Sequence, residues 1–301
     1  MDQNDITAVP EFILMGLTDL PELQVLHFLV FLAVYPISLL LNLGLTVLIK
    51  IDSRLHTLMY FFLGYLSAFY LSYFSAIALK MLAVFFLEVR TISLIECTIQ
   101  IYHFVACVTI EGYLLVVMAY DCFTAICNPL VYTVVMSPRV CTQLILCSYL
   151  IGFLQGLIQV LLIFHLPFCK LNIINHFFCD LSPILKLLCS NTFPSEVLLF
   201  SLGLFNGTVT SLEIVVSYVY ILITTLKIRS ATGRCKAFST CVSHLTVVGS
   251  LYGTTIFIYI RPSSQYTPEN DKVVFMFYTP VMLMLNPLIS SLRKKDVKDA
   301  L

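Results

Sequence analysis

The stretch LHFLVFLAVYPISLLLNLGLTVLI, residues Leu26–Ile49, decides the fold class because it contains no Asp, Glu, Lys or Arg. About 20 apolar residues in a helix cross the hydrocarbon core of a bilayer. In that core every backbone N–H and C=O needs a partner within the protein. The stretch therefore predicts a membrane-spanning helix.

Six further apolar runs of comparable length follow along the chain. They lack the alternating pattern of a membrane β-barrel, and no linker rich in Gly, Ser or Pro separates them. The sequence therefore predicts an all-α membrane protein, a single seven-transmembrane helix bundle. The six runs are Leu58–Leu79, Ile99–Tyr120, Val140–Ile163, Val197–Leu226, Ala237–Ile260 and Val273–Ser291.

The composition excludes several classes of function. Of the 301 residues, 59% are hydrophobic and 11% are charged, against roughly 25% charged in a typical soluble domain. The formal net charge is zero, so no basic surface for nucleic acid is indicated. The sequence contains no HExxH, nucleophile-elbow or P-loop motif. We expect no enzyme activity, cofactor or metal. We expect membrane lipid to be the main surroundings of the protein.

The charges flanking the runs predict the orientation. Residues 1–25 include acidic residues but no Lys or Arg, so they lack the basic region of a cleavable signal peptide. With the N-terminus outside, eleven of the 17 Lys and Arg residues fall on the inner side, as the positive-inside rule requires. We therefore expect an extracellular tail over 1–25, the bundle over 26–291 and a cytoplasmic tail, a short amphipathic helix, over 292–301.

Six local sequences, in order and at matching spacing, resemble the vertebrate olfactory receptors, a branch of the rhodopsin-like G-protein-coupled receptors. The resemblance extends from about Glu11 to Asp299. It implies an odorant receptor at the plasma membrane that signals through a stimulatory G protein to adenylate cyclase. The six are LHTLMYFFL (Leu55–Leu63), MAYDCFTAICNPLVY (Met118–Tyr132), NHFFCD (Asn175–Asp180), SY (Ser217–Tyr218), KAFSTCVSHL (Lys236–Leu245) and LNPLISSLRKKDVK (Leu285–Lys298).

Four of the eleven cysteines fall in segments expected to face outward, where disulfides persist. Four cysteines allow three pairings. The resemblance implies a Cys97–Cys179 bond, which pins the second outer loop across the bundle, and a Cys169–Cys189 bond, which closes that loop on itself. An alternative is a metal site at His176, Cys179 and Asp180, which a disulfide at Cys179 would exclude.

The expected ligand site combines helical spacing with the resemblance. A stripe at i, i+1, i+4, i+5 and i+8 places five residues on one face of the third helix; the resemblance places eight more opposite it. Such a lining suits a small, largely apolar, uncharged odorant, although ordinary helix packing is the alternative for each residue. The stripe is Phe104, Val105, Val108, Thr109 and Gly112; the others are Leu202, Asn206, Tyr252, Thr255, Ile256, Tyr259, Met276 and Thr279.

Two acidic residues lie in the middle of predicted spans, Glu111 in the third and Glu213 in the fifth. A carboxyl group at that depth is costly and normally faces the interior of the bundle. Both are therefore expected to mark a polar interior. Glu111 also stands at a position that the resemblance favours for a structural or gating role.

The chain departs from the resembling family at the switch that would contact the G protein. The resemblance assigns the switch to Asp121, Cys122, Tyr218, Asn286 and Pro287. Cys122 stands where the family carries an arginine, and a thiol cannot replace a cation with five donors.

Two further positions depart in the same way: Tyr70 replaces an aspartate, and Ser290 replaces a tyrosine. A receptor fold with impaired coupling is therefore the alternative to a working odorant receptor. A secondary transporter is a weaker one, because no pair of broken helices recurs in two halves of the chain.

Overall fold

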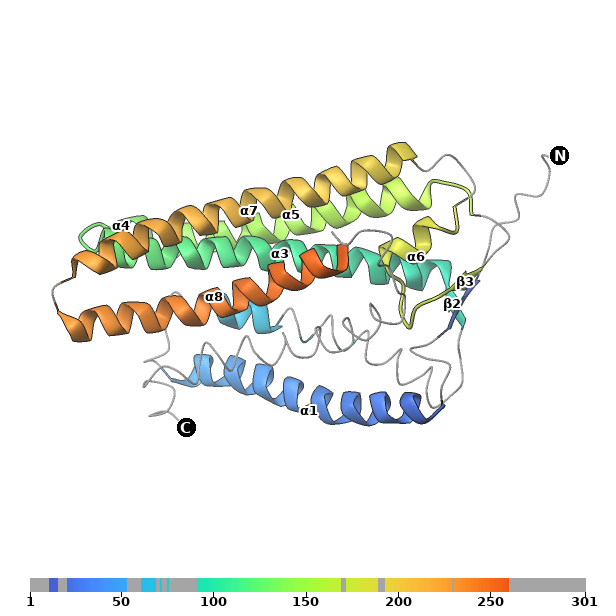
Figure 1. Ribbon diagram of the computed structural model, residues 1–301, viewed down its shortest axis with the longest axis horizontal. Coiled ribbons are helices and arrows are strands. Elements are labelled where there is room, and N and C mark those ends of the chain that lie inside the picture. Colours follow the sequence, from blue (N-terminus) through green and yellow to red (C-terminus); the bar gives the residue numbers. More distant parts are fainter. Residues whose placement is uncertain are drawn as a thin grey trace.

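The computed structural model describes residues 11–15, 21–52, 61–68, 71, 75, 91–168, 172–188, 193–228 and 230–259. Within these residues, five long helices lie side by side along the long axis of the molecule (Figure 1). They are α1 (Pro21–Ile51), α3 (Leu94–Cys127), α5 (Pro138–Phe164), α7 (Phe193–Lys227) and α8 (Ala231–Tyr259). They overlap the first, third, fourth, fifth and sixth predicted spans, and 61–68 of the second are helical. The seventh span and the C-terminal tail lie outside the described residues.

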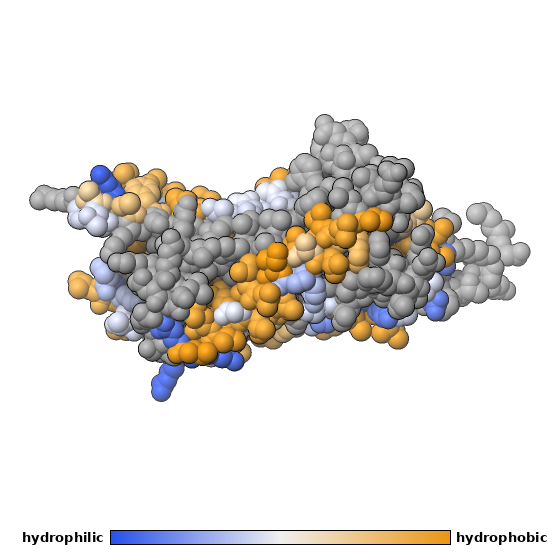
Figure 2. Space-filling view, turned by 90° about the horizontal axis from the view of Figure 1, so that it is seen from below, coloured by the Kyte–Doolittle hydropathy of each residue, from blue (hydrophilic) through white to orange (hydrophobic). Residues whose placement is uncertain are grey.

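The described surface suits a lipid environment. Among the described residues, four helices are long and apolar enough to cross a membrane by length and composition. Much of the coloured surface in Figure 2 is apolar. Helix α5 illustrates this, because one side presents a row of exposed leucines and the other packs inward. The row is Leu146, Leu150, Leu154, Leu157 and Leu161.

Helix α3 is longer than the predicted span because its first turn is capped. Ser93 Oγ accepts a hydrogen bond from the Glu96 backbone N–H at 3.2 Å, and Glu96 Oε2 accepts one from the Ser93 N–H at 3.1 Å. This reciprocal capping box satisfies two backbone donors that a helix start leaves open. The helix therefore begins at Leu94, outside the apolar run that begins at Ile99.

Helix α3 is the central element and packs against α5, α7 and α8. The α3–α5 approach is close because Gly152 and Gly156 of α5 face the α3 backbone. A Cβ atom on Gly152 would lie 2.9 Å from the Ala106 carbonyl oxygen and would overlap Ile110; one on Gly156 would lie 2.9 Å from the Tyr102 carbonyl oxygen. Small residues at such spacing let two membrane helices touch.

This packing makes Gly152→Ala destabilising. The added methyl group has no room, and overpacking of this kind costs about 1–3 kcal/mol. We expect a lower thermal unfolding temperature in detergent. Gly203→Ala is the matched control, because a Cβ there meets nothing within 4 Å and alanine is the better helix former. Equal unfolding temperatures for the two variants would contradict the close packing.

A three-stranded sheet, in the order β2-β1-β3, lies at one end of the bundle. Strand β1 (Glu11–Leu14) pairs antiparallel with β2 (Thr91–Ser93) and parallel with β3 (Ile173–Ile174). Its side chains alternate, so Phe12 and Leu14 are fully buried. The sequence predicted a tail here, without a strand. Part of that segment is paired with residues before α3 and after α5, the segments that the predicted orientation makes the first and second outer loops.

Candidate functional site

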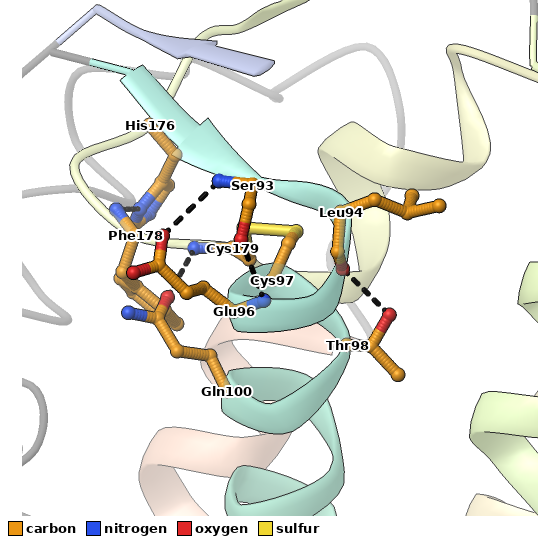
Figure 3. The surroundings of a disulfide bond; sticks show 9 residues. All are labelled: Ser93, Leu94, Glu96, Cys97, Thr98, Gln100, His176, Phe178 and Cys179. Carbon is orange, nitrogen blue, oxygen red and sulfur yellow. Dashed lines mark hydrogen bonds between the residues drawn. A yellow bond between two sulfur atoms is a disulfide. The ribbon is translucent and has the colours of Figure 1, made fainter. Parts of the chain in front are cut away.

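The disulfide expected between Cys97 and Cys179 is present, with 5.4 Å between the two Cα atoms. It joins the first turn of α3 to the second outer loop (Figure 3). The Gln100 side chain adds a second link, since its Oε1 accepts a hydrogen bond from the Cys179 N–H at 3.2 Å. The sulfur of Cys179 is thus bonded to carbon and sulfur and cannot act as a thiolate metal ligand with His176 and Asp180. The metal interpretation is set aside.

The second outer loop fills the end of the bundle with aromatic rings. His176, Phe177 and Phe178 are buried, and the His176 ring lies 4.6 Å from Phe177 and 4.5 Å from Phe178 between ring centroids. Phe178 in turn lies 6.2 Å from Phe104 of α3. The first residue of the expected ligand stripe is therefore in contact with the loop that the disulfide fixes.

The second bond of this loop stays a prediction, because Cys169 and Cys189 lie outside the described residues. Their neighbours Phe168 and Leu188 form an antiparallel β-bridge. The two ends of the segment that the bond would close are therefore held together by backbone pairing.

At its C-terminal end, Gly112, the stripe on α3 faces α7 and α8. Val105 and Gly112 are buried, and Phe104, Val108 and Thr109 are half-buried. A Cβ atom on Gly112 would lie 3.9 Å from the Tyr252 hydroxyl oxygen and 4.0 Å from Thr210 Oγ1. A hydroxyl group from each of two other helices thus lies beside Gly112 of α3, at a distance that would still accommodate a Cβ atom.

Two hydrogen bonds join the three helices at this level. The Tyr252 hydroxyl of α8 donates to Thr210 Oγ1 of α7 at 2.5 Å. The Tyr113 hydroxyl of α3 donates to Asn206 Oδ1 of α7 at 2.9 Å. Asn206 also donates from Nδ2 to the Leu202 carbonyl at 2.9 Å. Of these residues, Leu202, Asn206 and Tyr252 were predicted and are brought together.

Two residues of this network, Tyr113 and Thr210, are not among the predicted ligand-site residues. A helical pattern could have indicated both, because Tyr113 follows Thr109 by four residues and Thr210 follows Asn206 by four. Residues four apart share one helix face. They extend the predicted faces by one residue on α3 and by one turn on α7.

The two mid-span acids are placed differently from each other. Glu111 is buried in α3, as expected for a carboxyl at this depth. Glu213 is exposed, so the expectation that it marks the bundle interior is not met. The reason is the rotation of α7 about its own axis. The buried face of α7 contains Thr210 and Ile214, and Glu213 lies beside that face.

At the end of the bundle that the predicted orientation places inside, Asp121 is buried and accepts a hydrogen bond from the Tyr132 hydroxyl at 2.8 Å. Tyr132 lies on α4 (Tyr132–Val135) in the loop after α3. Burial is the main cause that raises the pKa of Tyr132, and the nearby Asp121 carboxylate raises it further. The phenol therefore stays protonated and keeps donating at neutral pH, which ties the inner loop to α3.

The other switch residues form contacts between α3, α7 and α8. Tyr218 of α7 shares a hydrogen bond of 2.8 Å between its hydroxyl and Nδ1 of His244 on α8. Cys122 is buried in a cluster with Ile221 and Cys241. Asn286 and Pro287 lie outside the described residues.

Comparison with known proteins places the chain in a family. A sequence profile described as "Olfactory receptor" matches residues 31–301. The chain is 52% identical to human olfactory receptor 5L1, over all of this chain and 97% of that protein. The chain belongs to the olfactory receptor family. It is also 52% identical to mouse olfactory receptor 5G26, over 98% of this chain and 93% of that protein, and 51% identical to human olfactory receptor 5I1, over 98% and 94%.

Membership in the olfactory receptor family confirms the predicted fold class, a seven-helix bundle of a membrane receptor, and the resemblance drawn from the six local sequences. The role of all the expected ligand-site residues stays a prediction. In this receptor Thr255 is half-buried and donates to the Leu251 carbonyl at 2.9 Å. Ile256 is 53% exposed. Tyr259 ends α8, while Met276 and Thr279 lie outside the described residues.

Proposed function

We propose that this olfactory receptor binds a small, largely apolar and uncharged odorant between α3, α7 and α8, below the disulfide-pinned outer loop. The observation that supports this most is the junction at Gly112. There the Tyr252 and Thr210 hydroxyls lie within ordinary contact distance of the place that a side chain at Gly112 would occupy, and the Tyr252 hydroxyl donates to Thr210 Oγ1. The same region is lined by half-buried apolar side chains of α3. Packing plus a few hydroxyl groups is the lining that suits such ligands.

We further propose that the receptor lies in the plasma membrane with its N-terminus outside and signals through a stimulatory G protein to adenylate cyclase. The basic residues support this orientation, because they are concentrated on the α4 side of the bundle. In this arrangement the strands β1, β2 and β3 are extracellular. Asp121, Cys122 and Tyr218 then lie at the end that would meet the G protein.

The ligand site is tested by removing polar groups while keeping side-chain size. We expect Thr109→Val, Asn206→Leu and Tyr259→Phe together to weaken the response to an activating odorant. Losing one hydrogen bond in a dry site costs roughly 1–3 kcal/mol, or roughly a 5- to 150-fold loss of potency. Cyclic-AMP dose–response curves at equal surface density measure this effect.

Thr208→Val is the matched control for this test. Its hydroxyl is exposed on α7 and, within the part of the chain that the structure describes, bonds only to the carbonyls of Leu204 and Phe205 in its own helix. The control should leave potency unchanged. If the triple variant also responds like the unmodified receptor, the ligand binds elsewhere.

A receptor with impaired coupling is the second candidate, and the surroundings of Cys122 favour it. The thiol lies among apolar side chains, with Ile221 and Phe123 nearby, and offers one weak donor where an arginine offers five. A ligand shifts the receptor toward its active state only through contacts that differ between the two states. Losing contacts made only with the G protein therefore lowers the response at every ligand concentration.

We expect Cys122→Arg, alone and combined with Tyr70→Asp and Ser290→Tyr, to raise the maximal cyclic-AMP response at equal surface density. Cys122→Leu is the control, because it fills the same site without adding donors. Equal maximal responses for the unmodified receptor, Cys122→Arg and Cys122→Leu would show that coupling is not limited at position 122.

A further inference from the structure

Cys122, which departs from the family at the switch, shares a buried cluster with a thiol on another helix. Cys122 belongs to α3 and Cys241 to α8, and both side chains belong to one buried cluster with Ile221 of α7. They are 7% and 6% exposed. Both sulfurs are thiols in the structure. Two helices that are far apart in sequence thus each place a sulfur in one apolar cluster.

The groups around the pair hold α7 and α8 in register. Tyr218 packs against the cluster, and its hydroxyl is joined to His244 Nδ1, one helical turn along α8 from Cys241. A third thiol, Cys127, packs against the same cluster. Its Sγ, however, donates to Thr224 Oγ1 of α7 at 3.3 Å. Cys127 is thus engaged with α7, whereas Cys122 belongs to the same buried cluster as Cys241.

We propose that Cys122 and Cys241 form a redox-modification site at which a small peroxide joins α3 to α8 by a disulfide. A small uncharged oxidant suits a site that is nearly closed to solvent. One thiol reacts with hydrogen peroxide to give a sulfenic acid and one water. The second thiol then displaces the hydroxyl group, which forms the S–S bond and releases a second water. Two thiols are oxidised and one peroxide is reduced to two waters.

The bond would act directly on the inner face of the bundle. A disulfide holds two Cα atoms within about 7 Å, so the inner ends of α3 and α8 could not separate. If the chain is the receptor proposed above, on which this consequence rests, oxidation would hold it in the closed form. The reducing cytosol normally favours thiols, so the bond is expected under oxidation and reversible by reduction.

A cut between α7 and α8 makes the bond visible on a gel. A protease site inserted between Lys227 and Ala231 divides the full chain after it has assembled in the membrane. The C-terminal fragment then contains two cysteines, Cys235 and Cys241. Isolated membranes are treated with hydrogen peroxide, blocked with a thiol alkylator, cut and run without reductant. We expect the tagged C-terminal fragment to run with the N-terminal fragment, and to separate after dithiothreitol.

Single substitutions assign the bond. Cys122→Ser and Cys241→Ser should each abolish the linked band, whereas Cys127→Ser and Cys235→Ser should keep it. Cys122→Val and Cys241→Val repeat the test with apolar replacements, and surface staining shows that each variant is folded. A linked band that survives Cys122→Ser, or none from the unmodified chain, overturns the proposal. The assay needs no odorant and no G protein, so it is independent of the proposed signalling function.

Discussion

Replacing Cys97 with serine is expected to remove most of the receptor from the cell surface. The disulfide spans 82 residues of sequence, and a bond closing a loop of this length contributes roughly 2–5 kcal/mol by constraining the unfolded chain. It also fixes the loop that carries Phe178 against Phe104. Its loss therefore weakens the fold and opens the expected ligand site together.

The measurement is surface staining of an N-terminal epitope tag, compared with total receptor in permeabilised cells. Cys179→Ser and the Cys97→Ser/Cys179→Ser double variant should lose as much as the single variant, because all three lack the same bond. Cys147→Ser is the matched control, since this cysteine is an exposed thiol on α5. A Cys97→Ser receptor that reaches the surface as well as Cys147→Ser would show that the bond is dispensable for folding.

Replacing Phe12 with alanine is expected to have an effect of similar size, although Phe12 precedes the first span. Its side chain is fully buried, packs in one cluster with Cys97 and Cys179, and lies 5.4 Å from the ring of Phe168. Truncating a buried phenylalanine costs about 3–5 kcal/mol. Because the strand pairs with both outer loops, this loss should loosen the outer end of the bundle.

Ile13→Ala is the matched control for Phe12→Ala, because Ile13 is the next residue of the same strand but is exposed. We expect a large loss of surface staining and a lower unfolding temperature for Phe12→Ala, and little change for Ile13→Ala. Equal behaviour of the two variants would mean that the strand does not contribute to stability.

The sequence predicted the helices because lipid imposes a local rule. An apolar run must satisfy its own backbone, so Leu26–Ile49 indicated α1 without information about any other segment. Helix ends were less predictable. The first turn of α3 lies outside the apolar run and depends on the Ser93–Glu96 capping box, a signal of two polar residues in an outer loop.

The features that were not predicted depend on contacts between distant residues. Strand β1 is four residues long and pairs with segments near 92 and 173, so no periodicity within it could have indicated a strand. Tyr113 and Asn206 are 93 residues apart, and their pairing follows from how α3 and α7 are rotated. The same rotation leaves Glu213 exposed, although its depth in the span suggested an interior position.

The most direct test of the proposed function is a cyclic-AMP measurement on cells that express the receptor and a stimulatory G protein. Surface density is measured in the same cells, and the unmodified chain and Cys122→Arg are exposed to a broad panel of volatile, apolar compounds. We expect at least one compound to raise cyclic AMP in a dose-dependent way, with the larger maximum in Cys122→Arg. If both receptors are stained at the surface and neither responds to any compound, the proposed function is contradicted.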